Sequence, residues 1–349
     1  MILRFSLIVL MILSAPGIPG ALENVAYVPH YRLRPVRGAE NALGRPSWDA
    51  RANAWDGRLI ADTDRAYGLP AHWSEGSWIR RLGARYDRVI FHTDMASFPF
   101  EGPERRSVTI LKRLIRPGGQ RVFFSILGVS RDFLPHLESE ESLAEFCDLF
   151  VELARREGLD GIDIDWEFIG MPKSRELEGL QRLAEALRAA LPSEITLSTA
   201  VSPSRPPEKR FFDAIDEVFI MSYDHRGRHA TLEAAVADTE NIISRFELDP
   251  SRVYLGIPWY GRNDDADSPS YWREALNYRD IVIQYDPEPG DNQAGPFYFN
   301  GIEMIRAKID FAGERELGGV FVWEPFYDIN GPMSLGRAAA RARDSPELP

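Results

Sequence analysis

The stretch LDGIDIDWEF, residues 159–168, places acidic side chains among residues suited to a protein core. Side chains two positions apart on a β-strand point to the same face, so Asp163, Asp165 and Glu167 share one face. The residues between them, Ile162, Ile164 and Trp166, point to the opposite face. The segment therefore predicts a buried strand that carries a column of carboxyl groups.

Similar apolar, β-branched or aromatic runs recur along the chain, at residues 25–31, 88–92, 121–127, 161–166, 195–201, 217–223, 253–260 and 319–323. The stretches between them show helical periodicity, most clearly residues 141–156, 174–191, 231–246 and 301–314. Strands that alternate with helices in this way predict an α/β protein, a single (β/α)8 TIM barrel. The alternative is a doubly wound open sheet, but no glycine-rich phosphate loop follows the first run.

In such a barrel the acidic face points to the interior. Three neighbouring carboxyl groups cannot all ionise cheaply there, so the column should hold protons at neutral pH. Glu167 lies nearest the carboxyl end of the strand, where barrels bind ligands, and is the best candidate for a general acid with a raised pKa. Asp165 and Asp163 lie progressively deeper. Asp160 has the opposite parity, and we expect it to accept structural hydrogen bonds.

Two other interpretations of this segment are weaker. A calcium loop also uses closely spaced acids, but it places turn-forming residues and glycine between them, whereas isoleucine and tryptophan separate them here. A solvated acidic strand is the second alternative, but the apolar residues between the acids indicate that this strand is buried. We therefore expect no metal and no cofactor.

Charge and composition narrow the class of ligand. The 349-residue chain has 41 basic and 53 acidic residues, a net charge of −12, and no block of lysine and arginine. This argues against nucleic-acid binding and favours an uncharged or weakly charged ligand. We expect a monomer.

The N-terminus has the pattern of a signal peptide. An apolar run at residues 5–13 follows Arg4 and precedes small residues and prolines, and it is too short to span a bilayer as a helix. An uncleaved anchor is the alternative, although Pro16 and Pro19 would break its continuation. We expect residues 1–21 to be a signal peptide, residues 22–349 to form the catalytic domain, and the mature protein to be secreted or periplasmic, away from the membrane.

The segment DGIDIDWE (residues 160–167) resembles the D-x-x-D-x-D-x-E signature of glycoside hydrolase family 18, the chitinases and their relatives. Further matches follow in the family's order, at the ends of other predicted strands. They are FFSILG (123–128), LSTAVSP (197–203), MSYD (221–224), GIPWYGR (256–262) and GGVFVW (318–323).

The resemblance implies a role for each matching residue. Glu167 matches the family's proton donor, Asp165 the residue that orients the substrate's acetamido group, and Asp163 its buried partner. Tyr223 matches the tyrosine that binds the acetamido carbonyl. The matching sugar-contacting residues are Met221, Asp224, Tyr260, Arg262 and Trp323, with Tyr27 a weaker match. The resemblance further implies a retaining mechanism in which the substrate's N-acetyl oxygen is the nucleophile.

The implied substrate contains N-acetylglucosamine (GlcNAc) joined by β-1,4 linkages, as in chitin oligomers or related glycans. The chain departs from the family at two places. Leu127, Gly128, Val129 and Ser130 stand where many chitinases have a tryptophan, and the connection at residues 263–299 looks too short for a large inserted α+β subdomain. Both departures predict a shallower, more open cleft. Short GlcNAc oligomers, peptidoglycan fragments and the chitobiose cores of glycans all remain possible substrates. The alternative function is a non-catalytic, lectin-like relative that only binds GlcNAc oligomers.

Overall fold

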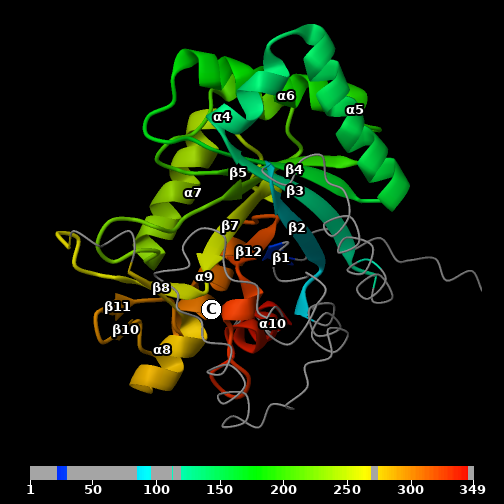
Figure 1. Ribbon diagram of the computed structural model, residues 1–349. Helices are drawn as coiled ribbons and strands as arrows, with labels where there is room; N and C mark the ends of the chain where they lie inside the picture. Colours follow the sequence, from blue (N-terminus) through cyan, green and yellow to red (C-terminus); the bar gives the residue numbers. More distant parts are fainter. Residues whose placement is uncertain (1–21, 30–84, 96–111, 113–118, 269–273, 345–349) are drawn as a thin grey trace, which may run out of the picture.

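A computed structural model describes residues 22–29, 85–95, 112, 119–268 and 274–344. Its strands form a closed barrel in the order β1-β12-β7-β6-β5-β4-β3-β2, and every neighbouring pair is parallel (Figure 1). The TIM barrel predicted from the alternating runs is confirmed. The predicted signal peptide lies outside the described residues.

Each barrel strand overlaps one of the eight apolar runs, although the strand in the run at residues 217–223 ends at Ile220. They are β1 (Glu23–Pro29), β2 (Arg88–Asp94), β3 (Arg121–Val129), β4 (Gly161–Glu167), β5 (Thr196–Val201), β6 (Glu217–Ile220), β7 (Val253–Pro258) and β12 (Gly319–Trp323). The four predicted helices are α5 (Glu140–Glu157), α6 (Ser174–Ala190), α7 (Leu232–Phe246) and α9 (Ile302–Glu314). Shorter helices are α4 (Ser130–Phe133), α8 (Tyr278–Tyr285), α10 (Leu335–Asp344) and the 3-10 turns at 134–137, 209–213, 250–252 and 325–327.

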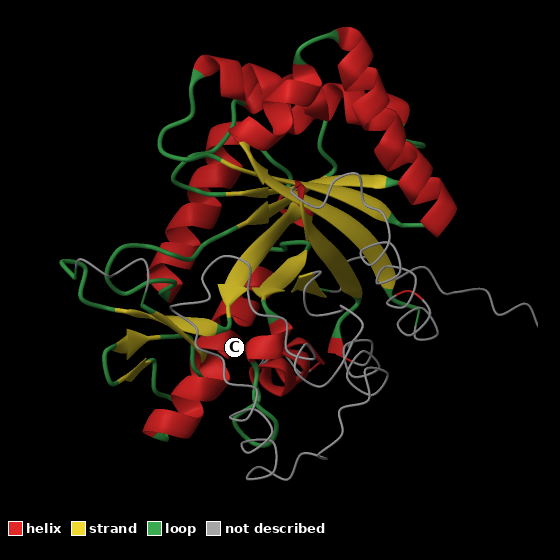
Figure 2. Ribbon diagram, viewed as in Figure 1, coloured by secondary structure: helices red, strands yellow, loops and turns green. Residues whose placement is uncertain are grey.

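Local sequence signals explain where α5 begins and ends. The Ser139 side chain accepts a hydrogen bond from the backbone N–H of Ser142, which caps the first turn. Gly158 ends the helix in the left-handed conformation, at φ 54°, which glycine adopts without steric cost. Figure 2 shows the helices packed outside the barrel strands.

Strand β4 is buried on both faces, because the barrel interior lies on one side and the helices on the other. Ile162, Ile164 and Trp166 face outward and join the large apolar core beneath the helices. A second, smaller core fills the barrel interior, with Tyr27 and Phe321 among its members. The parity predicted for the acidic strand is therefore correct.

Arg88 closes the end of the barrel where the strands begin. Its guanidinium group is fully buried, bonds Glu23, Glu217 and the Tyr254 hydroxyl, and lies 4.4 Å from the centre of the Phe123 ring. These charged and aromatic groups fill this end of the barrel.

The chain between β7 and α9 differs from the expected loop. The run predicted as one strand at residues 253–260 breaks at Trp259, after which β8 (Tyr260–Asn263) joins a separate antiparallel sheet with β9 (Ala275–Asn277), β10 (Gln293–Ala294) and β11 (Phe297–Tyr298). This connection is a small insertion of four short strands and α8. It turns away because Trp259 is buried, and its backbone N–H donates to the carbonyl of Trp323 on β12.

Candidate active site

The three predicted carboxyl groups of β4 lie in order from the barrel core to its mouth. Asp163 is 0% exposed, Asp165 is 5% exposed, and Glu167 at the end of the strand is open to solvent. Asp165 and Glu167 line a cavity of about 370 Å³, and Asp163 lies beneath it. The column places two acids at the cavity and one behind them.

Asp163 accepts hydrogen bonds from three described hydroxyl groups. Ser198 donates to Oδ1 at 2.7 Å, while Ser125 donates at 2.7 Å and Tyr27 at 3.0 Å to Oδ2. Burial raises the pKa of Asp163, and these three bonds oppose that rise because they stabilise the ionised form. Asp163 is thus a buried carboxyl group whose hydrogen-bonding capacity is largely taken up by its neighbours.

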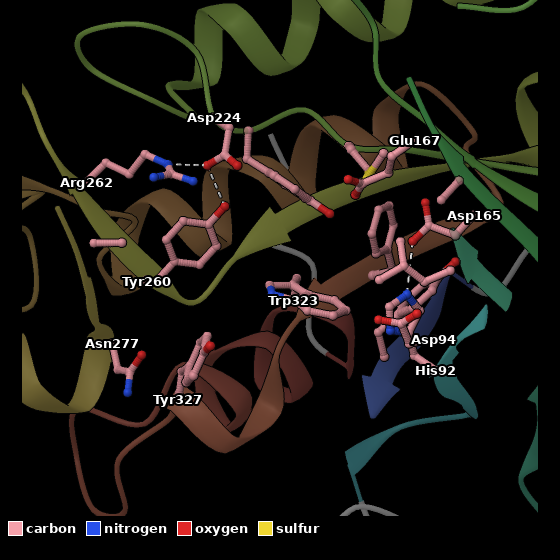
Figure 3. Close-up of a pocket in the computed structure, with 17 residues that line it drawn as sticks. His92, Asp94, Asp165, Glu167, Asp224, Tyr260, Arg262, Asn277, Trp323 and Tyr327 are labelled. Carbon is pink, nitrogen blue, oxygen red and sulfur yellow. Dashed lines mark hydrogen bonds and ion pairs between the residues drawn. The ribbon is translucent and has the colours of Figure 1, made fainter. Parts of the chain in front are cut away.

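Asp165 has a different partner. Its Oδ2 lies 3.0 Å from Nε2 of His92, a buried residue on β2 (Figure 3). Burial and the charge of Asp163 raise the pKa of Asp165, while burial lowers the pKa of His92 to about 4. The hydrogen bond holds one proton, on Nε2 or on Oδ2, and burial disfavours the charged form of both groups.

Glu167 has the properties expected of a general acid. Its carboxyl group is accessible at the cavity mouth, yet the walls remove enough water, and Asp165 adds enough negative charge, to raise its pKa to about 7. Desolvation is the larger of these causes. A group with this pKa holds a proton through mildly acidic conditions and can also accept one back.

Nine of the ten predicted site residues border the cavity, and Asp163 is the exception. Among them, Asp224 accepts a hydrogen bond from the Tyr260 hydroxyl at 2.6 Å and from Nε of Arg262. These two donors outweigh the effect of burial and lower the pKa of Asp224. The cavity wall beside β8 therefore carries an ionised carboxylate held in place by a tyrosine and an arginine.

Aromatic rings form much of the remaining surface. Trp323, at the end of β12, contacts His92 with ring centres 5.0 Å apart and Tyr27 at 6.4 Å. In the view of Figure 3 it lies between the Asp224 cluster and the Asp165–His92 pair. Tyr223 contacts Tyr260 edge to face, and burial raises its pKa well above 10, so its hydroxyl stays protonated. Met221 also borders the cavity.

Several lining residues were not predicted. His92 and Asp94 lie on β2, and alternation along that strand could have placed both in the barrel interior. Asn277 and Tyr327 come from the insertion and from the turn after β12, where no periodic pattern marks them. The small insertion therefore contributes to the site, at Asn277 and Ala275.

No described helix is long and apolar enough to cross a membrane. Within the part of the chain that the structure describes, no group of three or more histidine, cysteine, aspartate or glutamate residues is arranged to hold a metal ion.

Comparison with known proteins decides the family. The sequence model described as Glycosyl hydrolases family 18 matches residues 106–328, which is more than half of the chain. The chain belongs to this family. Its family 18 signature is the acidic segment of β4, so the predicted resemblance is confirmed.

Curated relatives support this membership at low identity. Nod factor hydrolase protein 1 of Medicago truncatula is 25% identical over 248 residues, covering 54% of this chain and 63% of that protein. Sporulation-specific chitinase 2 of Saccharomyces cerevisiae is 29% identical over 277 residues, covering 58% of this chain and 54% of that protein. The chain thus spans between about half and under two thirds of the length of these two relatives.

Two solved chitinase structures share the fold of this chain. A chitinase from Bacteroides thetaiotaomicron superposes with a TM-score of 0.72 at 16% identity, covering 93% of this chain and 97% of that one. A chitinase from Cycas revoluta in complex with (GlcNAc)3 gives 0.66 at 18% identity, covering 92% and 99%.

Proposed function

We propose that this protein is a chitinase-type glycoside hydrolase that cleaves β-1,4 linkages next to GlcNAc with retention of configuration. The observation that carries this proposal is the carboxyl column. Glu167 has a pKa of about 7 at the cavity mouth, directly above the Asp165–His92 pair and the hydroxyl-bonded Asp163. The family signature in the same strand supports it.

In the proposed reaction Glu167 donates its proton to the glycosidic oxygen, and the bond from that oxygen to C1 breaks. The carbonyl oxygen of the substrate's 2-acetamido group forms a bond to C1 and gives a cyclic oxazolinium ion. Asp165 accepts a hydrogen bond from the acetamido N–H, and the Tyr223 hydroxyl donates to the acetamido oxygen. Glu167, now ionised, takes a proton from water as the water opens the ring, and the original face of C1 is restored.

The cavity lining fits a sugar that bears an amide. Trp323 offers an aromatic surface to the apolar face of a pyranose ring, while Asp224, Tyr260 and Arg262 offer polar groups at one side. The volume of about 370 Å³ is near the lower end of the range for small-molecule sites, roughly 300–1,000 Å³. We therefore propose short GlcNAc oligomers as substrates, which agrees with the (GlcNAc)3 ligand of the Cycas revoluta structure.

The wider proposal is a monomer that is exported by its N-terminal segment, residues 1–21, and needs no metal or cofactor. Export rests on the apolar run and the prolines of that segment. A lectin-like relative that only binds the same oligomers is the alternative. The presence of an ionisable Glu167 with a matched pKa favours catalysis.

The test compares two matched series of 4-methylumbelliferyl glycosides, one of GlcNAc and one of glucose. We expect release from the GlcNAc series alone, because the nucleophile is then part of the substrate. Glu167→Gln should lose roughly 10²–10⁴-fold in rate on unlabelled oligomers and still bind them. Binding by the parent protein without turnover would favour the lectin-like alternative, and comparable release from glucose would exclude the acetamido group as nucleophile.

A further inference from the structure

His92 is one of the buried groups in the site that the sequence did not predict. It lies on β2, whose register pairs His92 with Ser125 on β3, and Ser125 pairs in turn with Asp163 on β4. Its Nε2 atom is 3.0 Å from Asp165 Oδ2, and its side chain is almost fully buried. Its ring also contacts Trp323 and Tyr27. A histidine here can act through its hydrogen bond or only through its shape.

The hydrogen bonds of Asp163 and Asp165 indicate that His92 acts through its hydrogen bond. Asp163 already accepts bonds from Ser198, Ser125 and Tyr27, so it does not need a proton from Asp165 to satisfy its oxygens. Asp165 bonds His92 through Oδ2, and its buried Oδ1 has no hydrogen-bond partner among the described residues. Asp165 borders the cavity, and Oδ1 is the carboxyl oxygen left without a partner among the described residues there.

We propose that His92 is a positioning residue that holds Asp165 by Oδ2, so that Oδ1 is presented to the N–H of the substrate's acetamido group. This inference rests on the proposed function. Oδ1 remains an acceptor whether the shared proton sits on Nε2 or on Oδ2, because a protonated carboxyl group keeps its carbonyl oxygen. His92 thus orients the carboxyl group without touching the sugar.

Many charged or titratable groups face His92, and all of them except Tyr27 are acids. Asp163, Asp165 and Glu167 approach from β4, Asp94 from its own strand, Glu324 from the residue after β12, and Tyr27 from β1. These carboxyl groups favour a proton on the pair, while burial disfavours the imidazolium ion. Loss of the His92 bond should therefore raise the pKa of Asp165 further, because an ionised carboxyl group loses a donor.

Two substitutions separate the hydrogen bond from the shape of the ring. His92→Gln places an amide N–H near the position of Nε2 but removes the ring, and His92→Phe keeps a ring but removes the donor. A loss of orientation can cost about 10²-fold in rate. We expect this loss in kcat for His92→Phe, with little change in KM. His92→Gln should stay within about tenfold of the parent.

His136 provides a matched control, since it is a partly exposed histidine that stacks on Phe146 outside the cavity. His136→Gln should leave kcat and the pH profile unchanged. If His92→Phe retains more activity than His92→Gln, the ring contacts with Trp323 and Tyr27 explain the residue and the proposal is wrong. The same conclusion follows if both variants lose activity only in proportion to their unfolded fraction.

A second measurement does not depend on activity. Side-chain ¹⁵N spectra of the six histidines, assigned through His92→Gln, report the state of Nε2 directly. Asp165→Ala, or Asp165→Asn if the alanine variant does not fold, should shift the His92 Nε2 resonance and leave that of His136 in place. An unmoved His92 resonance would overturn the proposal. An inactive parent with a shifted resonance would instead refute the proposed function and leave the His92–Asp165 bond established.

Discussion

Ser198→Ala tests whether hydroxyl groups keep Asp163 ionised in the barrel core. Ser198 is the only described donor to Asp163 Oδ1, at 2.7 Å, and both residues are fully buried. Hydrogen bonds to charged groups contribute about 1.5–3 kcal/mol to stability, and bonds between neutral groups about 0.5–1.5 kcal/mol. The cost of the substitution should therefore depend on the protonation state of Asp163.

The cost of Ser198→Ala should increase with pH, because the stability of the folded protein is linked to the pKa of Asp163. Burial already raises the pKa of Asp163 in the folded protein above the unfolded value of 3.8, and losing a donor raises it further. Below pH 3.8 the group is protonated in both states, so Ser198→Ala should cost only the neutral bond, about 1 kcal/mol. As the pH rises through the folded pKa, the cost should grow by about 1.4 kcal/mol for each added pKa unit.

Thr199→Val is the matched control on the next residue. Thr199 is also buried, but it faces the other way and donates to the neutral carbonyl of Ile164 at 2.9 Å. Its loss should cost about 0.5–1.5 kcal/mol at every pH. Urea unfolding of both variants and the parent between pH 4 and 9 gives the comparison. If the loss of unfolding free energy depended on pH in the same way for both variants, the Ser198 bond would not stabilise an ionised Asp163.

Three further predictions follow from buried or desolvated groups. The kcat/KM for unlabelled GlcNAc oligomers should be high below pH 7 and fall above it, because Glu167, with its pKa of about 7, loses the proton it must donate. A kcat/KM that is constant up to pH 9 would contradict this. Lys308 is buried and donates to Ala230 O and Asn300 Oδ1 at 2.8 Å each, and burial lowers its pKa to about 7. Above pH 7 the unfolded chain therefore binds more protons at this residue than the folded protein does. The free energy of unfolding should consequently rise from pH 7 towards 10. Lys308→Met should cost about 1–3 kcal/mol in urea unfolding and abolish that rise. Cys147 is buried with a pKa raised to about 12, so we expect it to react with a thiol reagent only after unfolding, and rapid modification of the native protein would contradict its burial.

The sequence alone determined the barrel and the column of acids. A strand buried on both faces leaves a continuous apolar run, and a two-residue period then assigns each side chain to the interior or to the helix layer. These are local properties, so residues 159–168 were sufficient to put Asp163, Asp165 and Glu167 on one face, and the eight recurring runs then predicted that this face lies inside a barrel. The family motifs at other strand ends added Tyr223 and Trp323 to the predicted site.

The tertiary structure decided what each acid bonds to. Tyr27, Ser125 and Ser198 reach Asp163 from β1, β3 and β5, across 136, 38 and 35 residues of chain. His92 reaches Asp165 across 73 residues, and the break at Trp259 carries Asn277 to the cavity wall. Such partners are selected by the register between strands and by packing, which bring distant segments together only when the barrel closes. Because burial and hydrogen bonding set the pKa of each carboxyl group, the different chemistry of these three acids depends on the closed barrel.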